Sequence, residues 1–296
     1  MTNVSGLPSS FGFFWHWNRR SLESIRRMRR KFVRVRYMYR KYLTLIASLL
    51  LACQVFPATN QISASAQSDV PPLASATQML VVTTKNWDAV PGVMRRFARV
   101  DAQSAWSKIG APIPIVVGRN GLGWGRGLNP AAGLPGPVKK EGDGKSPAGI
   151  FRLSSAFGLA APDQMKSLKM PYNQLTVGVE CVDDVKSAHY NSIVDRGRIG
   201  HPDWNSSEKM RDVGAPYQLG VVVDHNTDPR EAGGGSCIFL HIWQDARTGT
   251  SGCTAMARGK MEALLPWLDP AAHPLLVQLP ESEYKLLQKH WQLPPP

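Results

Sequence analysis

The segment from Cys237 to Met256 carries the clearest chemical pattern in the chain. His241 lies near the end of an apolar run that favours a β-strand, and a polar, glycine-containing loop then leads to Cys253. A turn that returns the chain beside the strand brings Cys253 within reach of His241, and glycine permits such a turn. Cysteine attacks as a thiolate, and an adjacent imidazole either removes its proton or holds it as an ion pair. The pattern therefore predicts a cysteine nucleophile with a histidine base.

Residues close to this pair indicate how an intermediate and a substrate are held. Gly252 lets another group approach the backbone closely, so the amide N–H groups of Gly252 and Cys253 can stabilise a tetrahedral oxyanion, with Ser251 in support. His225 and Asn226 follow another apolar run. We expect both to line the same cleft and to contact substrate.

The basic charge of the chain is concentrated at its N-terminus. The 296 residues carry a formal net charge of +13, and eleven of the 35 lysines and arginines lie between Arg19 and Lys41, where Glu23 is the only acid. The uncharged run 42–56 follows, and it is shorter than the ~20 residues of a membrane-spanning helix. A basic segment, a short apolar run and a small-residue stretch ending at Ala66 are typical of a secretory signal, so we predict cleavage after Ala66.

Two alternatives for this leader stay open. Translation can begin at Met38, which gives a signal of ordinary length, and the tetrapeptide ending at Cys53 resembles a lipoprotein box with Cys53 as the acylated residue. We take residues 1–66 as the leader and 67–77 as a linker. In either case we expect the working domain to be exported to the periplasm or cell envelope, with membrane contact only through the leader. The remaining residues carry a net charge of about +3, so we expect no nucleic-acid partner.

Three cysteines lie beyond the leader, namely Cys181, Cys237 and Cys253. An odd number in an exported protein implies at least one free thiol, which is often kept for its reactivity. Cys181 and Cys237 can pair and leave Cys253 free, but the sequence does not determine the connectivity.

Short apolar runs rich in β-branched residues recur between Gly, Pro and Asp residues and predict strands. Helical spacing is clear at Met261, Leu264, Leu265 and Leu268, and residues 281–291 can form a short C-terminal helix. Strands and helices do not alternate, so a parallel nucleotide-binding sheet is not expected. The sequence predicts a single, mainly β, antiparallel domain over 78–293 with a few short helices. Its strands are expected at 79–84, 113–117, 150–153, 219–223, 238–243 and 275–279.

With these motifs the chain resembles the L,D-transpeptidase catalytic domain of YkuD type, a family of cysteine enzymes that remodel bacterial peptidoglycan. Phe239-Leu240-His241 and Ser251-Gly252-Cys253 are similar to the segments that carry the family's catalytic histidine and nucleophilic cysteine. Glu141–Phe151 resembles the family's Thr-Pro-x-Gly-x-Phe segment and its glycine-rich approach. The resemblance covers most of 78–293 and implies a β-sandwich-like fold. Further similar stretches are 117–121, 181–184, 190–191 and 204–210.

The chain departs from the commoner form of the family's motif at several positions. That form has Ser-His-Gly-Cys and an arginine two residues after the cysteine, whereas this chain has Thr250-Ser251-Gly252-Cys253 and Ala255. The spacing of 12 positions between His241 and Cys253 is also shorter. The nucleophile and the base are kept, but these changes leave open how the substrate is held and which reaction dominates.

The resemblance implies an exported enzyme of acyl transfer whose partners are peptidoglycan stem peptides. Cys253 would attack the amide before the terminal D-alanine of a tetrapeptide, and His241 would serve as base toward the thiol and as acid toward the leaving amine. An amine acceptor would then form a cross-link, whereas water would make the enzyme an L,D-carboxypeptidase. This chemistry needs no metal and no cofactor, and we expect a monomer.

Two hypotheses from other classes are kept. A zinc hydrolase would use His225, His241 and Cys253 with Asp224 nearby, although the chain has no compact paired-ligand motif such as H-E-x-x-H. A wall-binding protein with a decayed active site is suggested by Ala255, which stands in place of the family's arginine.

Overall fold

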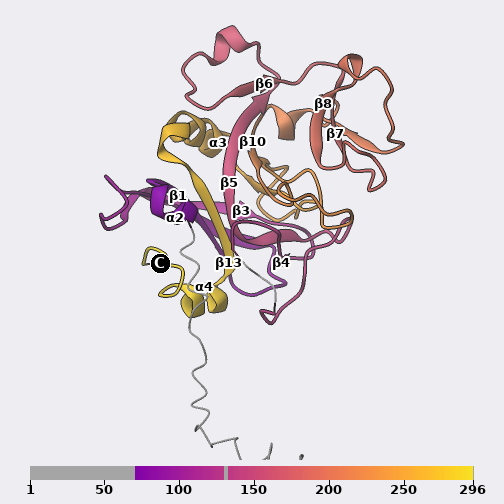
Figure 1. Ribbon diagram of the computed structural model, residues 1–296. Helices are drawn as coiled ribbons and strands as arrows, with labels where there is room; N and C mark the ends of the chain where they lie inside the picture. The colour runs from indigo at the N-terminus through magenta and orange to yellow at the C-terminus, as the bar shows by residue number, and fades with distance from the viewer. Residues whose placement is uncertain (1–70, 130–132, 296) are drawn as a thin grey trace, which may run out of the picture. The chain divides into compact units, whose positions relative to one another are not determined.

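The computed structural model describes residues 71–129 and 133–295 (Figure 1). The chain divides into two units, 1–66 and 67–296, and all the described residues belong to the second unit. The predicted leader, its cleavage site and the alternatives at Met38 and Cys53 lie outside the described residues. No helix among the residues that are described has the length and apolar character needed to cross a membrane.

A large sheet forms the framework of the described part of the chain. Its ten strands are β1 (Gln78–Thr84), β2 (Pro91–Ala98), β3 (Ser107–Val116), β4 (Leu122–Trp124), β5 (Ser146–Gly158), β6 (Tyr172–Gln174), β10 (Leu219–Val223), β11 (Phe239–Ile242), β12 (Thr254–Met256) and β13 (Leu275–Pro280). They follow the order β10-β11-β12-β3-β2-β1-β13-β5-β4, and β6 pairs with β5. Because β10 also pairs with β5, the path closes on itself.

The length of β5 explains this closure. In Figure 1, β5 is the long central strand between β13 and β10. Its first part pairs with β13, where Arg152 lies opposite Leu275, and its second part pairs with β10, where Leu153 lies opposite Val223. A strand of 13 residues therefore joins the two ends of one sheet. The sandwich expected from the resemblance is corrected to a barrel-like sheet.

The predicted strands and their mainly antiparallel pairing agree with the structure, which also contains further strands and some parallel pairs. Each of the six expected runs overlaps an observed strand, and 219–223 coincides with β10. The pairs β1–β13, β11–β12, β4–β5 and β5–β6 are parallel, however. Strand β2 was not expected, because Arg95 and Arg96 interrupt its apolar pattern; both side chains are only partly buried.

A second, three-stranded sheet has the order β8-β7-β9 and consists of β7 (Val179–Val182), β8 (Ser192–Asp195) and β9 (Ser207–Lys209). Its centre is held by the buried carboxylate of Glu180, which pairs with Lys209 and Arg196. A disulfide between Cys181 in β7 and Cys237, just before β11, connects the two sheets. The pairing that the sequence left open is therefore formed.

Helices are short and pack against the framework. They are α2 (Pro71–Ser75), α3 (Arg258–Leu264) and α4 (Glu281–Leu287), with 3-10 turns at Pro162–Met165, Arg196–Arg198, Ala215–Tyr217, Leu265–Trp267 and Pro270–Ala272. Met261, Leu264, Leu265 and Leu268 are all buried, as their helical spacing predicted. Helix α2 lies in the segment expected to be a linker, and α4 ends before the predicted residue 291.

Candidate active site

Two neighbouring parallel strands position the predicted nucleophile and base. His241 lies within β11 opposite Ala255 of β12, and Cys253 directly precedes β12. The chain therefore returns beside β11 in a parallel direction, through a loop rather than through a hairpin turn. Ala255 is fully buried in this pairing, so the position has no room for the arginine of the commoner motif.

The thiol of Cys253 is buried, with 7% of the residue exposed. Its Sγ accepts a hydrogen bond from the Phe239 N–H at 3.3 Å and donates one to the Cys237 carbonyl at 3.4 Å. Burial, together with the negative charge of Glu208, raises the pKa of this thiol to about 12. Among the described residues, Cys253 is the free cysteine, since Cys181 and Cys237 are paired. The thiol thus needs a partner that removes its proton.

His241 is also buried, with 8% of the residue exposed. Its Nδ1 lies 2.8 Å from the Ile242 carbonyl, so Nδ1 carries the proton and Nε2 keeps its lone pair. Burial lowers the pKa of the imidazole, which favours the neutral form that can accept a proton. His241 and Cys253 line the same cleft, but within the described structure their side chains are not hydrogen-bonded to each other.

The backbone at the nucleophile is held by two hydroxyl groups. Ser146 Oγ donates to the Cys253 carbonyl at 2.8 Å, and Thr250 Oγ1 donates to the same oxygen at 2.6 Å. The Gly252 N–H donates to Thr250 Oγ1 at 3.1 Å, so this amide is already engaged in the structure. Ser251 is exposed at the rim of the cleft, where its Oγ accepts a hydrogen bond from Arg119 at 3.2 Å.

His225 and Asn226 lie outside the residues that line the cleft. His225 Nδ1 accepts from the Arg126 N–H at 3.2 Å, and its Nε2 lies 3.0 Å from the Gly234 carbonyl. Burial lowers the pKa of His225 to about 4. Asn226 bonds through its side chain to the backbone of Glu231 and Gly235. Both residues therefore shape the loop that follows β10, away from the cleft that holds Cys253.

The ring nitrogens of His225 are both used by backbone groups, which bears on the zinc hypothesis. Asp224 accepts a hydrogen bond from Ser154 at 2.6 Å. Over the described ranges, no group of three or more His, Cys, Asp or Glu side chains is arranged to hold a metal ion. The geometry offers no support for the set His225, His241 and Cys253 as zinc ligands.

The cleft around Cys253 has a volume of about 650 Å³ and is lined by charged side chains that are not part of the predicted site. They include Arg119, Lys139, Asp183 and Glu208, which come from segments that are distant in sequence, and the phenol of Tyr217 also lines the cleft. A signal was present for three, because the similar stretches 117–121, 181–184 and 204–210 contain Arg119, Asp183 and Glu208. Their proximity depends on the fold.

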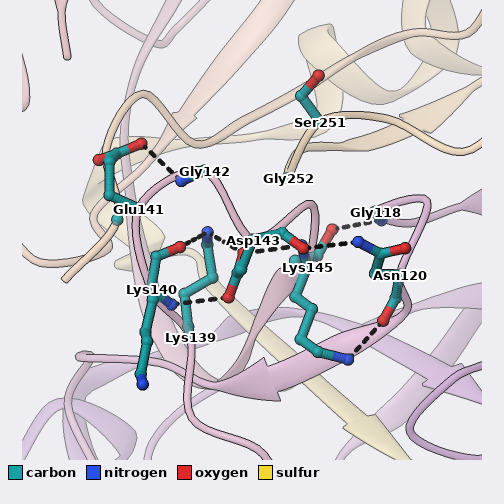
Figure 2. A network of polar contacts seen from close by, with 12 residues as sticks. Gly118, Asn120, Lys139, Lys140, Glu141, Gly142, Asp143, Lys145, Ser251 and Gly252 are labelled. Atoms are coloured by element: carbon teal, nitrogen blue, oxygen red, sulfur yellow. Dashed lines mark hydrogen bonds and ion pairs between the residues drawn. The ribbon is translucent and has the colours of Figure 1, made fainter. Parts of the chain in front are cut away.

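A network around the buried Lys139 forms one wall of the cleft (Figure 2). Lys139 Nζ donates to Asp143 Oδ1 and to the Lys140 carbonyl, each at 2.6 Å. Asp143 also accepts from the Lys145 N–H at 2.9 Å, which closes the glycine-rich loop beside Ser251 and Gly252. A Cβ at Gly118 would lie 2.3 Å from the Gly144 carbonyl oxygen, so only glycine allows these loops to pack this closely.

Comparison with known proteins agrees with this architecture. The family model of the YkuD L,D-transpeptidase catalytic domain matches residues 103–277, which is more than half of the chain. The match includes β11, β12 and the segments that line the cleft. No curated protein and no solved structure matches the chain. On the family match, the chain belongs to the L,D-transpeptidase catalytic domain family.

Proposed function

We propose that the protein is an exported peptidoglycan L,D-transpeptidase in which Cys253 is the nucleophile. Membership of the family gives L,D-transpeptidase-type catalysis on peptidoglycan. The observation that carries the assignment of Cys253 is its placement. It is the free thiol of the described chain and lies in a cleft that is also lined by His241, whose Nε2 is unprotonated.

The proposed reaction has two halves. The Cys253 thiolate attacks the carbonyl carbon that precedes the terminal D-alanine of a stem tetrapeptide, so an S–C bond forms and, after collapse of the tetrahedral intermediate, the C–N bond breaks. His241 Nε2 takes the thiol proton as the thiolate forms and gives it to the nitrogen of D-alanine as this amine leaves. The amine of a second stem then attacks the thioester, and His241 Nε2 accepts the proton that this amine releases. The thiolate is the leaving group and is protonated again.

Export is supported by the disulfide between Cys181 and Cys237. Disulfides form and persist in oxidising compartments such as the periplasm and are rare in the cytoplasm. Fractionation of cells that express the full chain tests this part: the protein should be found in the envelope or periplasm, shortened at Ala66. A full-length cytoplasmic protein with reduced cysteines would contradict it.

Incubation with purified disaccharide tetrapeptides, followed by mass spectrometry, tests the reaction. The wild type should form dimers that have lost one D-alanine, whereas Cys253→Ala should form none. Cys253→Ser is the matched control, because it replaces the thiol by a hydroxyl of similar size. Tripeptide monomers without dimers would show the carboxypeptidase alternative. An unchanged substrate with wild type and variant alike would leave the wall-binding alternative.

A further inference from the structure

Arg119 is held against the chain segment that leads to the nucleophile. Its backbone N–H donates to the Thr250 carbonyl at 2.8 Å, and the Thr250 N–H donates to the Val117 carbonyl at 3.0 Å. Thr250 and Ser251 come shortly before Cys253 in the sequence. The side chain of Arg119 also reaches this segment, because its Nη1 donates to Ser251 Oγ at 3.2 Å. Backbone and side-chain contacts therefore place the guanidinium beside the nucleophile.

The glycine-rich loop fixes Arg119 from the other side. The Asn120 side-chain amide donates to the Asp143 carbonyl at 2.7 Å, and Lys145 Nζ donates to the Asn120 carbonyl at 2.6 Å (Figure 2). A Cβ at Gly144 would lie 3.1 Å from Cγ and from Cζ of Arg119, so the absence of a side chain at Gly144 makes room for this arginine. A group that is fixed before a ligand arrives loses less entropy when it binds that ligand.

The positive charge of Arg119 is not neutralised by the protein. Within residues 71–129 and 133–295, no carboxylate forms an ion pair with Arg119. Lys139 also lines the cleft, but it is paired with Asp143. The guanidinium of Arg119 carries a fork of N–H donors, and its hydrogen bond to Ser251 uses Nη1. Arg119 thus offers the cleft a cation with donors for an anionic ligand.

The other charges of the cleft direct an anion to this cation. Asp183 and Glu208 line the cleft from the three-stranded sheet, and Glu141 lines it as well. These carboxylates repel a carboxylate ligand, whereas Arg119 attracts it. The stem tetrapeptide of the proposed reaction ends in a carboxylate, and this group is bonded to the same carbon atom as the scissile nitrogen. A cation beside Cys253 is therefore within reach of that carboxylate when the amide lies at the thiol.

We propose that Arg119 binds the terminal carboxylate of the acyl-donor tetrapeptide and so selects stems that end in a free D-amino acid. The inference rests on the proposed function, because it takes Cys253 as the nucleophile that releases D-alanine. Charge-assisted hydrogen bonds from the guanidinium hold the carboxylate, and Ser251 orients the guanidinium. Proton transfer stays with His241. A guanidinium thus enters the cleft although the arginine position of the commoner motif is the buried Ala255.

Two tetrapeptides that differ in a single group test this assignment: the stem that ends in D-alanine, and the same stem ending in D-alaninamide. Mass spectrometry follows the release of D-alanine or D-alaninamide, so cross-linking and hydrolysis are counted alike. Arg119→Gln should lower kcat/KM for the acid about 10- to 100-fold, the loss expected for hydrogen bonds to a charged group. For the amide, kcat/KM should stay within about twofold of wild type, since the carboxylate is absent. Each substrate is compared with itself, which cancels the difference between the leaving amines.

Arg152→Gln is the matched control, because Arg152 is an exposed arginine of β5 that lines a different pocket. It should change neither rate. An equal loss on acid and amide in Arg119→Gln would show that Arg119 only supports the surrounding loops, and it would overturn the inference, as would an unchanged rate on the acid.

The wild type alone gives a second test, which does not depend on the folding of a variant. It should release D-alanine with a higher kcat/KM than D-alaninamide, and equal values would contradict a carboxylate site. Failure of the proposed function has a different signature. In that case the wild type would release neither product, or Cys253→Ala would release D-alanine as well.

Discussion

The disulfide between Cys181 and Cys237 provides a test of both the fold and the site. Its removal by the double substitution Cys181→Ala and Cys237→Ala releases a closed loop with a sequence separation of 56 residues. In the chain-entropy relation, a loop of this length corresponds to about 4 kcal/mol of folding free energy. For a domain of this size, such a loss lowers the melting temperature by about 8 to 16 °C.

The double substitution should also affect the nucleophile Cys253. The Cys237 carbonyl lies 3.4 Å from Cys253 Sγ, and the Cys237 N–H is held by Asn191 Oδ1 at 3.0 Å. Cys237 has φ of 56°, a left-handed conformation that costs a non-glycine residue of order 1–2 kcal/mol. Without the cross-link this conformation can relax, so we expect kcat to fall about tenfold, which corresponds to about 1.4 kcal/mol.

Thermal unfolding by near-UV circular dichroism and the cross-linking assay give the two readouts. The wild type treated with a reductant should melt at the same temperature as the double variant. Cys253→Ala should keep the disulfide and the stability that it contributes. Mapping of alkylated cysteines in the unreduced protein should find Cys253 labelled and Cys181 and Cys237 protected. A loss of less than 2 °C, taken as about a quarter of the smallest expected shift, or labelling of Cys181 without reductant, would refute this account.

Two further predictions follow from buried polar groups. Ser146→Ala leaves the Gly118 N–H without its 2.8 Å acceptor and removes one donor to the Cys253 carbonyl. Unfolding in urea should therefore show a free energy of unfolding lower by about 2–3 kcal/mol, and kcat should fall. Unchanged stability would contradict this. Burial opposes ionisation of Glu180, but hydrogen bonds and the charge of Lys209 lower its pKa from 4.5 to about 2. This carboxylate therefore contributes stability above pH 4.5 that is lost as the pH falls toward 2, at most about 3 kcal/mol, and the free energy of unfolding of Glu180→Gln should lack that part of the pH dependence.

Much of the local structure could be predicted because it depends on short-range patterns. The run 219–223 is apolar and β-branched, and it forms β10 with the same bounds. Met261 and Leu264 share one helical face, and both are buried in α3. Strand β2 could not be predicted, since its neighbours β1 and β3, not its own composition, decide that Arg95 belongs to a sheet.

The sequence by itself determined the chemistry that the chain can offer: a cysteine and a histidine at a spacing that resembles a known family, and an odd number of cysteines after residue 66. Only the tertiary structure decided which cysteines pair and that the sheet closes through β5. It also decided that both ring nitrogens of His225 are hydrogen-bonded to backbone groups. The fold further decided that Tyr217 and Glu208 are hydrogen-bonded to each other and line the same cleft as Cys253. Such proximity arises from strand pairing and packing between segments far apart in the chain, so no local sequence pattern predicts it.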